Sequence, residues 1–222
     1  YAGSAPRSAT VVFGNVPVAV TQQPASRSYY LSEGATGFIF DLDIAIANPN
    51  DVAVPVEVKF LRPGGGLEPV TQSFTLAAYE QRVVSVDAIA GLESTDVSTV
   101  VTSPTGAPLV VERTMFWDGT SYGGHGGTAV DGPRTRWYFA EGSQGFFDTF
   151  VLLANANAQP ANVTVTFLRE GGAPPLVTTT TLAANSRDNV WTRLVPDLAN
   201  TSFAIVVDSD VPITAERAMY FP

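Results

Sequence analysis

The stretch RWYFAEGSQGFFDTFVLLANAN, residues 136–157, is a second version of SYYLSEGATGFIFDLDIAIANPN, residues 28–50. The identical positions are Tyr30, Glu33, Gly34, Gly37, Phe38, Phe40, Asp41, Ala47, Asn48 and Asn50 in the first version, and Tyr138, Glu141, Gly142, Gly145, Phe146, Phe147, Asp148, Ala154, Asn155 and Asn157 in the second. An internal repeat means that one folding unit is encoded twice, so it decides the architecture before any single strand does.

The similarity between the two copies continues to the end of the chain. Near the close of each copy, Pro108, Glu112, Arg113 and Met115 correspond to Pro212, Glu216, Arg217 and Met219. We therefore define repeat one as residues 28–117 and repeat two as residues 136–222, each about 90 residues long and large enough for a hydrophobic core of its own. Residues 1–27 precede the repeats as a strand segment, and the Gly-rich residues 118–135 form a linker between them.

The hydrophobic pattern within each repeat is that of β-strands. In residues 38–47, large apolar side chains occupy every second position, which is the period of a half-buried strand. Similar alternation recurs in residues 54–60 and 70–76, and turns rich in Asn, Pro and Gly separate the runs. No helical period is present. We predict an all-β protein made of two tandem immunoglobulin-like antiparallel β-sandwiches, joined by the Gly-rich linker.

The composition argues against several classes of partner. The net charge is −9, with acidic residues spread along the chain, whereas nucleic-acid binding depends on cationic contacts to phosphate. The chain contains no cysteine, so disulfides, thiolate metal sites and cysteine nucleophiles do not occur. Its apolar runs are shorter than the ~20 residues that span a bilayer. We expect no nucleic-acid partner and no membrane insertion.

The amino-terminal segment contains strand-like residues that belong to neither repeat. Residues 10–21, TVVFGNVPVAVT, read as one or two strands interrupted at Gly14 and Asn15. Pro17 suits an edge strand, because proline lacks a ladder donor. The segment could complete the sheet of repeat one, or it could dock as an added strand on a neighbouring chain. The contact residues predicted for such an interface are Val11, Phe13, Val16, Val18 and Val20.

Candidate catalytic and metal-binding residues are few. His125, the only histidine, lies in the sequence GGHGG, which supplies neither the rigid frame nor the orienting partner that a catalytic histidine needs. We expect it to be an exposed spacer residue, and we assign no catalytic residue. The pairs Asp41/Asp43 and Asp208/Asp210 are each spaced by two, so each could project from one strand face and bind Ca²⁺. Solvated carboxylates are the favoured interpretation, and we expect no cofactor.

Two ion pairs are predicted from recurrence and parity. Glu33 and Arg113 recur as Glu141 and Arg217. Each arginine shares its strand face with apolar neighbours, so it would point toward the core, where it needs a carboxylate partner. We therefore predict a Glu33–Arg113 pair and an equivalent Glu141–Arg217 pair, each linking the first and last strands of its repeat.

The two copies also resemble a known family. The pattern WYFAEGS-x-GF-D-T-x-VLLAN in repeat two, followed by V-T-x-F-L-x-E-G-G and P-I-x-AERAMYF, is similar to a repeat family of unknown function that occurs in tandem in large secreted or surface-anchored bacterial proteins. Repeat one departs from it, with YYLS in place of WYFA. The resemblance implies extracellular placement and an immunoglobulin-like sandwich. It implies no activity and no functional residues.

Together these observations favour a non-enzymatic structural protein. We expect a repeat module of a cell-surface or extracellular assembly, such as a filament, pilus-like fibre or sheath, that associates with itself or with other surface proteins. The alternative is an adhesin or a carbohydrate-binding accessory module of a larger secreted protein. Aromatic side chains exposed in a row on one sheet face would favour that alternative.

Overall fold

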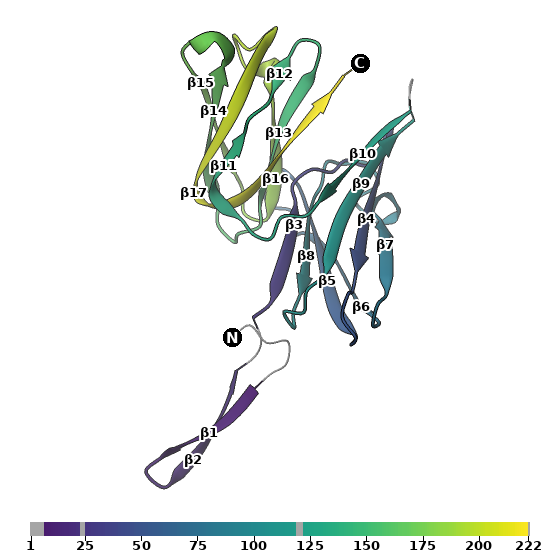
Figure 1. The fold of residues 1–222 in the computed structure, drawn as a ribbon, viewed down its shortest axis with the longest axis vertical. Helices are drawn as coiled ribbons and strands as arrows, with labels where there is room; N and C mark the ends of the chain where they lie inside the picture. Colours follow the sequence, from purple (N-terminus) through teal and green to yellow (C-terminus); the bar gives the residue numbers. More distant parts are fainter. Residues whose placement is uncertain (1–6, 23–24, 119–121, 222) are drawn as a thin grey trace.

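The computed structural model describes residues 7–22, 25–118 and 122–221 (Figure 1). Up to residue 128 the strands are β1 (Arg7–Phe13), β2 (Val16–Gln22), β3 (Arg27–Leu31), β4 (Phe40–Ala47), β5 (Val54–Pro63), β6 (Val70–Leu76), β7 (Gln81–Ser85), β8 (Ser98–Ser103), β9 (Val110–Trp117) and β10 (Gly123–Thr128). The later strands are β11 (Arg134–Phe139), β12 (Ser143–Gln144), β13 (Asp148–Asn155), β14 (Ala161–Arg169), β15 (Leu176–Leu182), β16 (Ser186–Trp191) and β17 (Thr201–Tyr220).

The prediction of an all-β protein is confirmed. Three short 3-10 turns are the helical elements of the described residues: η1 (Val86–Ala88), η2 (Glu170–Gly172) and η3 (Thr192–Leu194). None of the described helices is long and apolar enough to cross a membrane. The strands form a two-stranded sheet, a four-stranded sheet in the order β10-β9-β4-β7, and a large sheet that contains the remaining strands. The large sheet is mixed, because the short β16–β5 pairing is parallel.

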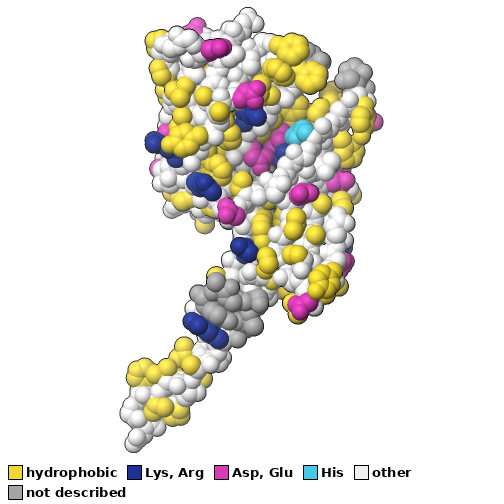
Figure 2. All heavy atoms as spheres, in the orientation of Figure 1, with side chains coloured by type: hydrophobic (Ala, Val, Ile, Leu, Met, Phe, Trp, Pro, Cys, Tyr) yellow, Lys and Arg dark blue, Asp and Glu magenta, His cyan; other side chains and the backbone are white. Residues whose placement is uncertain are grey.

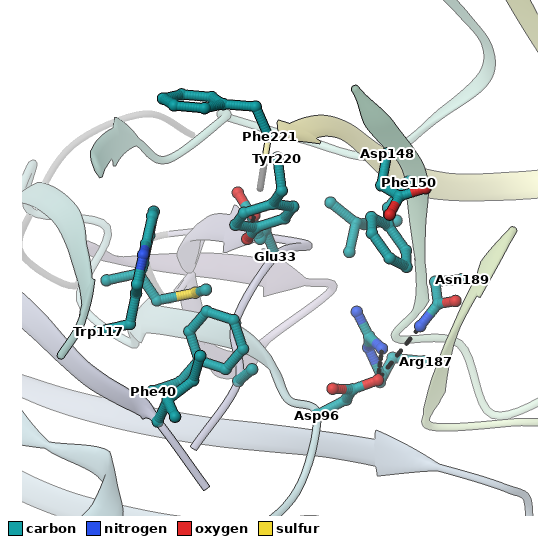
Figure 3. Close-up of a pocket in the computed structure, with 15 residues that line it drawn as sticks. Glu33, Phe40, Asp96, Trp117, Asp148, Phe150, Arg187, Asn189, Tyr220 and Phe221 are labelled. Carbon is teal, nitrogen blue, oxygen red and sulfur yellow. Dashed lines mark hydrogen bonds and ion pairs between the residues drawn. The ribbon is translucent and has the colours of Figure 1, made fainter. Parts of the chain in front are cut away.

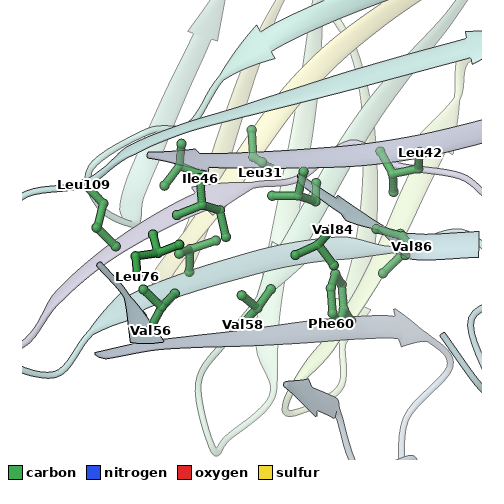
Figure 4. Packing of buried hydrophobic residues seen from close by; sticks show 14 of the residues in the cluster. Leu31, Leu42, Ile46, Val56, Val58, Phe60, Leu76, Val84, Val86 and Leu109 are labelled. Atoms are coloured by element: carbon green, nitrogen blue, oxygen red, sulfur yellow. The ribbon is translucent and has the colours of Figure 1, made fainter. Parts of the chain in front are cut away.

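A first hydrophobic core lies within residues 31–115, between two layers of strands (Figure 4). One layer is β10-β9-β4-β7, and the other contains β6, β5, β8 and β3. The alternation predicted for residues 38–47 places Leu42, Ile44 and Ile46 of β4 in this core with no exposed area. The opposing layer contributes Val58 and Phe60 of β5, which are buried to the same extent. Period-two patterning therefore selects the inward face of each strand.

A second core lies within residues 151–215 and is built from the later strands. β17 runs through Thr201–Tyr220 without interruption and pairs with four strands, β11, β12, β13 and β14. Its first half pairs with β14 and β11, and its second half pairs with β13. Repeat one uses β8 and β9 for the same two positions, with an irregular segment of residues 104–109 between them. One continuous strand thus links the two layers around the second core.

Buried asparagines stabilise the corresponding turn of each copy through the same hydrogen bonds. Asn48 and Asn155 are 1% and 0% exposed, and each donates from Nδ2 to two nearby carbonyls at 2.7–2.9 Å. Each Oδ1 accepts a backbone N–H two residues later, at 3.0 Å in both copies. The well-bonded carbonyl partners are Val52 and Ala77 for Asn48, and Gln159 and Ala183 for Asn155. This network closes the turn after β4 and after β13.

The amino-terminal segment folds on itself. β1 and β2 form an antiparallel hairpin around Gly14 and Asn15, and they constitute a separate two-stranded sheet. The predicted role in completing the sheet of repeat one is therefore wrong for the described residues. All five predicted contact residues are exposed, namely Val11 (41%), Phe13 (66%), Val16 (62%), Val18 (40%) and Val20 (48%). Figure 1 shows the hairpin projecting away from the rest of the chain. Residues 1–6 and 23–24 of this segment lie outside the described residues.

The Gly-rich segment is more than a spacer, which corrects the sequence interpretation. Residues 123–128 form β10, which pairs with β9 along its whole length, from Gly123 opposite Trp117 to Thr128 opposite Glu112. A side chain at Gly123 would meet the Trp117 ring at 2.6 Å, so glycine lets this strand approach the indole closely. The segment that joins the repeats is thus also an edge strand of the first core. Residues 119–121 lie outside the described residues.

Candidate functional site: the interface between the repeats

Arg113 of β9 lies at the centre of the contact between the repeats. Its Nη2 is 2.7 Å from Glu33 Oε2 in repeat one, and its Nη1 is 2.7 Å from Glu216 Oε2 in repeat two. The Arg113 side chain is 4% exposed and that of Glu33 is 5% exposed. A guanidinium presents donors in a planar fork, which suits it to two carboxylates at once. One buried cation therefore connects the two copies.

Glu216 also binds the backbone of repeat one. Its two carboxylate oxygens accept the N–H groups of Ser32 and Glu33, both at 3.1 Å. A second contact lies beside it, where the Ser32 hydroxyl donates to Thr214 Oγ1 at 2.9 Å. Since charge-assisted bonds to backbone N–H groups are directional, these contacts fix β17 against the loop that follows β3.

Tyr220 and His125 complete the surroundings of Glu33. The Tyr220 hydroxyl donates to Glu33 Oε1 at 2.6 Å, and His125 Nε2 is 3.4 Å from the same oxygen. Burial raises the pKa of Glu33, but the hydrogen bond with His125 and the charge of Arg113 outweigh it, so the pKa is lowered overall. Burial, with the nearby Glu33 carboxylate, raises the pKa of Tyr220. Glu33 is therefore ionised and Tyr220 is a neutral donor at neutral pH.

A second polar contact joins the repeats on the other side of this cluster. Arg187 of β16 is 1% exposed, and its Nη1 is 2.8 Å from Asp96 Oδ2 in repeat one. Asn189 Nδ2 donates to the same oxygen at 3.2 Å. Burial lowers the pKa of Arg187, although Asp96 opposes this effect. The parallel pairing of β16 with β5 lies next to this contact, with Ser186 opposite Arg62, so backbone and side chains act at the same place.

A cavity of about 410 Å³ lies between these two polar contacts (Figure 3). Aromatic rings from both repeats form much of its wall, and Glu33, Asp96 and Arg187 supply charges. Tyr220 makes edge contacts with Phe40 and Trp117 of repeat one, with ring centroids 6.1 Å and 5.7 Å apart. Phe150 contacts Tyr220 at 5.9 Å. Edge-to-face pairs stabilise a contact beyond the burial of their apolar area. The cavity is therefore surrounded by aromatic rings that help to hold the two repeats together.

Both predicted ion pairs lie within ion-pair distance in the structure, but their surroundings differ. The Glu33–Arg113 pair is buried, as described above. Arg217 Nη1 is 3.2 Å from Glu141 Oε2, and the Glu141 side chain is 77% exposed. The difference arises because β17 and β10 cover the first pair, whereas the described residues place no equivalent strand over the second.

The four candidate calcium ligands do not converge. Asp41 is exposed, as the alternation predicts, and Asp43 accepts a hydrogen bond from the Ser85 hydroxyl. Asp208 pairs with Arg136, and Asp210 accepts from the backbone and side chain of Asn162. Among the described residues, no group of three or more His, Asp or Glu side chains is arranged to hold a metal ion. Asp43, Asp208 and Asp210 therefore take part in local contacts on the strands.

Sequence reasoning assigned His125 wrongly and missed several interface residues. The His125 side chain is 32% exposed and contacts Glu33, Tyr220 and the Trp117 ring, so it is not an exposed spacer residue. Glu216 was seen only as a recurring residue, and Tyr220, Arg187 and Asp96 were not singled out. The strand register places Arg187 at the position of Gln81 and not at that of Arg82, since Arg187 and Gln81 lie opposite Ala154 and Ala47 respectively. A non-recurring arginine on a buried strand indicates a contact outside its own repeat.

Comparisons with solved structures find partial similarities that include the following two proteins. No family model matches the chain, and no curated protein matches it. Thermotoga maritima protein 1070 aligns with 48% of this chain and 94% of its own, at 15% identity and a TM-score of 0.41. The Anabaena sensory rhodopsin transducer aligns with 39% of this chain and 97% of its own, at 27% identity and a TM-score of 0.35. TM-scores this low assign no function.

The interface should weaken in acid. Glu33 has a pKa below its ordinary value of 4.5, so its contribution to stability is complete above that value and is lost as the pH falls through the lower, folded-state pKa. We expect the unfolding free energy to fall with decreasing pH below about 4.5, and Glu33→Gln to reduce this slope. Urea titrations of both proteins between about pH 3 and about pH 6 measure it. Equal slopes for the two proteins would contradict the assignment.

Proposed function

We propose that this protein is a non-enzymatic structural protein, a repeat module of an extracellular or cell-surface assembly such as a filament or sheath. The observation that supports the proposal is the buried Arg113, which bridges Glu33 of repeat one and Glu216 of repeat two at 2.7 Å each. Such a joint holds two copies of one unit at a fixed angle. A fixed angle between repeats is what a module needs if many units are to form a regular array.

The proposal includes the type of sandwich that each repeat forms. Each repeat is an immunoglobulin-like sandwich, and the two stand in tandem. Supporting this are the two separate cores and the equivalent asparagine networks at Asn48 and Asn155. Secreted or surface placement is supported by the family resemblance of the WYFAEGS and AERAMYF segments.

The polar groups of the interface support a structural role over a catalytic one. The buried Glu33 carboxylate accepts hydrogen bonds from Arg113 and Tyr220, and Arg113 also pairs with Glu216. A catalytic carboxylate needs access to a substrate proton, whereas this one is 5% exposed and directed at protein donors. The group therefore acts in holding the two repeats together.

The proposal requires the two repeats to move as one body, and solution scattering tests this. We expect the small-angle X-ray scattering profile of the purified chain to fit one fixed arrangement of the repeats. Glu216→Lys places a second cation beside Arg113 and should broaden the distance distribution. Asp51→Lys, at an exposed turn, is the matched control and should leave the profile unchanged. A wild-type profile that needs a broad ensemble of inter-repeat angles would count against a structural module.

One observation favours a second candidate function, a carbohydrate-binding or adhesin module. The cavity between the repeats has Phe40, Trp117, Phe150 and Tyr220 in its wall, together with polar side chains that include Asn189. Aromatic faces beside hydrogen-bonding groups suit sugar rings. A glycan array distinguishes the two candidates: specific binding that Trp117→Ala abolishes supports the binding module, and the absence of binding supports the structural role.

A further inference from the structure

The surface by which repeat one holds repeat two exists a second time, on repeat two, where it is exposed. We define the tail face by the repeat-two residues Ala140, Glu141, Phe147, Arg217 and Phe221, which correspond to Ser32, Glu33, Phe40, Arg113 and Trp117. The strand register supports this correspondence, because Asp41 lies opposite Phe116 and Asp148 lies opposite Tyr220. The Glu141 side chain is 77% exposed and Phe221 is 69% exposed.

The complementary surface also exists a second time, on repeat one. Repeat two docks through Arg187, Asn189, Thr214, Glu216 and Tyr220, and the corresponding residues of repeat one are Gln81, Val83, Val110, Glu112 and Phe116. We call this second set the head face. Val83 of β7 is 49% exposed and Val110 of β9 is 48% exposed. Glu112 of β9 is also exposed and lies across β4 from Val83, since both residues are opposite Ala45. These two half-exposed valines leave apolar area beside the carboxylate that a contact could bury.

An open strand edge lies beside the tail face. In repeat one, β9 is paired on both edges, with β4 and with β10. In the described part of the chain, residues 214–220 of β17 pair with β13 alone. This edge borders a groove of about 810 Å³ that β10 lines on its other side. An open edge offers backbone donors and acceptors to an added strand.

The hairpin strand β2 is the candidate for such an added strand, because it precedes repeat one in the sequence as β10 precedes repeat two. β10 ends at Thr128 and β11 begins at Arg134, so five residues (129–133) separate that strand from repeat two. β2 ends at Gln22 and β3 begins at Arg27, so four residues (23–26) separate it from repeat one. β2 therefore has the same relation to repeat one that β10 has to repeat two. Figure 2 shows that the hairpin carries hydrophobic side chains on its outside.

We propose that a second copy of this chain docks its head face on the tail face, in the geometry by which repeat two docks on repeat one. Glu112 of the second copy accepts hydrogen bonds from Arg217 and from the backbone N–H groups of Ala140 and Glu141, as Glu216 does from Arg113, Ser32 and Glu33 within one chain. β2 of the second copy pairs with the open edge of β17. This inference rests on the proposed structural function and names its partner.

The two faces differ from each other, so the contact does not close into a symmetric pair. Each chain keeps one head face and one tail face after docking, and heterologous contacts of this kind continue into an open array unless the rotation closes a ring. Charge complementarity supports the choice of partner. The Arg217–Glu141 pair of the tail face repeats the Arg113–Glu33 pair that accepts Glu216 within one chain, and Glu112 is the charged residue of the head face. The net charge of −9 adds a general repulsion between copies, which salt screens.

Charge reversals that block one face at a time test the proposal by sedimentation velocity. We expect the average mass of the full chain to rise with concentration. Glu112→Arg blocks the head, Arg217→Glu blocks the tail, and each alone should weaken association by about tenfold or more. Mixed together they should recover association, because the unchanged tail of one variant meets the unchanged head of the other, and the two reversed charges are opposite in sign. Ala19→Pro, which removes a backbone donor from the edge of β2 that faces away from β1, should also weaken association.

A charge reversal outside both faces is the matched control for this experiment. Asp51→Arg reverses an exposed charge outside both faces and should associate like the wild type. A wild type that stays at the mass of one chain at every concentration overturns the inference, and so does a mixture that does not recover association. The rigid scattering profile described above would still stand in either case, so loss of this inference is distinguishable from loss of the proposed function.

Discussion

Arg113→Met should destabilise the protein by about 3–5 kcal/mol. The substitution keeps an apolar side chain of similar length but leaves Glu33, whose side chain is 5% exposed, without its cation. It also removes the partner of Glu216 Oε2 and the donor to the Glu33 carbonyl. An uncompensated buried carboxylate carries the desolvation penalty that the pair had offset. Urea denaturation followed by tryptophan fluorescence measures the loss.

The repeat supplies an internal control for this experiment. Arg217→Met makes the same change at the corresponding position, but the carboxylate partner there, Glu141, is 77% exposed. Water solvates that carboxylate when the arginine is lost, so the expected cost is below about 1 kcal/mol. Similar losses for the two variants would show that burial of Glu33 by the second repeat does not strengthen its dependence on Arg113.

Asn155→Ala and Asn48→Ala should each cost about 3 kcal/mol. Each asparagine is almost fully buried, and its amide satisfies backbone carbonyls and one backbone N–H of the adjoining turn. Alanine leaves those groups without partners in a site that excludes water, and the penalty for such groups exceeds the net value of the bonds lost. The two losses should be nearly equal, because the two networks match bond for bond.

Asn162→Ala is the matched control for the asparagine variants. Asn162 lies on β14, is exposed, and donates to the exposed Asp210. Water can replace the lost amide there, so we expect a change below about 1 kcal/mol. Thermal and urea unfolding of the three variants in parallel give the comparison. A loss at Asn155 no larger than that at Asn162 would contradict the structural role of the network.

The amount of the fold that the sequence predicts depends on how local the signal is. The period-two alternation correctly selects the buried face of β4 from Leu42 onward, because side-chain direction along a strand follows from backbone geometry alone. It is wrong for Phe38, which precedes β4 and is 97% exposed. The Glu33–Arg113 partnership could also be anticipated, since a core-facing arginine requires a carboxylate. The strand β10 could not, because Gly123–Thr128 has no apolar alternation and is a strand only through its pairing with β9.

The residue pairs of the inter-repeat interface could not be predicted from the sequence either, because no local pattern reports them. The contacts of this interface join residues that are far apart in the sequence. Arg187 and Asp96 are 91 positions apart, and Arg113 and Glu216 are 103 positions apart. No local pattern encodes such a pairing. Recurrence across the repeats even hides it, because Glu216 has an exposed counterpart in Glu112. The same residue type is solvated in one copy and buried against a neighbour in the other.

The sequence by itself determined that one β-rich unit is present twice, that it builds its cores from alternating strands, and that a glutamate and an arginine are paired in each copy. Only the tertiary structure decided that the first of these pairs is buried and shared with the second copy, that the Gly-rich segment is a strand, and that the amino-terminal strands pair with each other. The physical reason is that alternation, turns and charge requirements act over a few residues. Burial and desolvation depend on which distant surfaces meet, and these decide how strongly each pair holds.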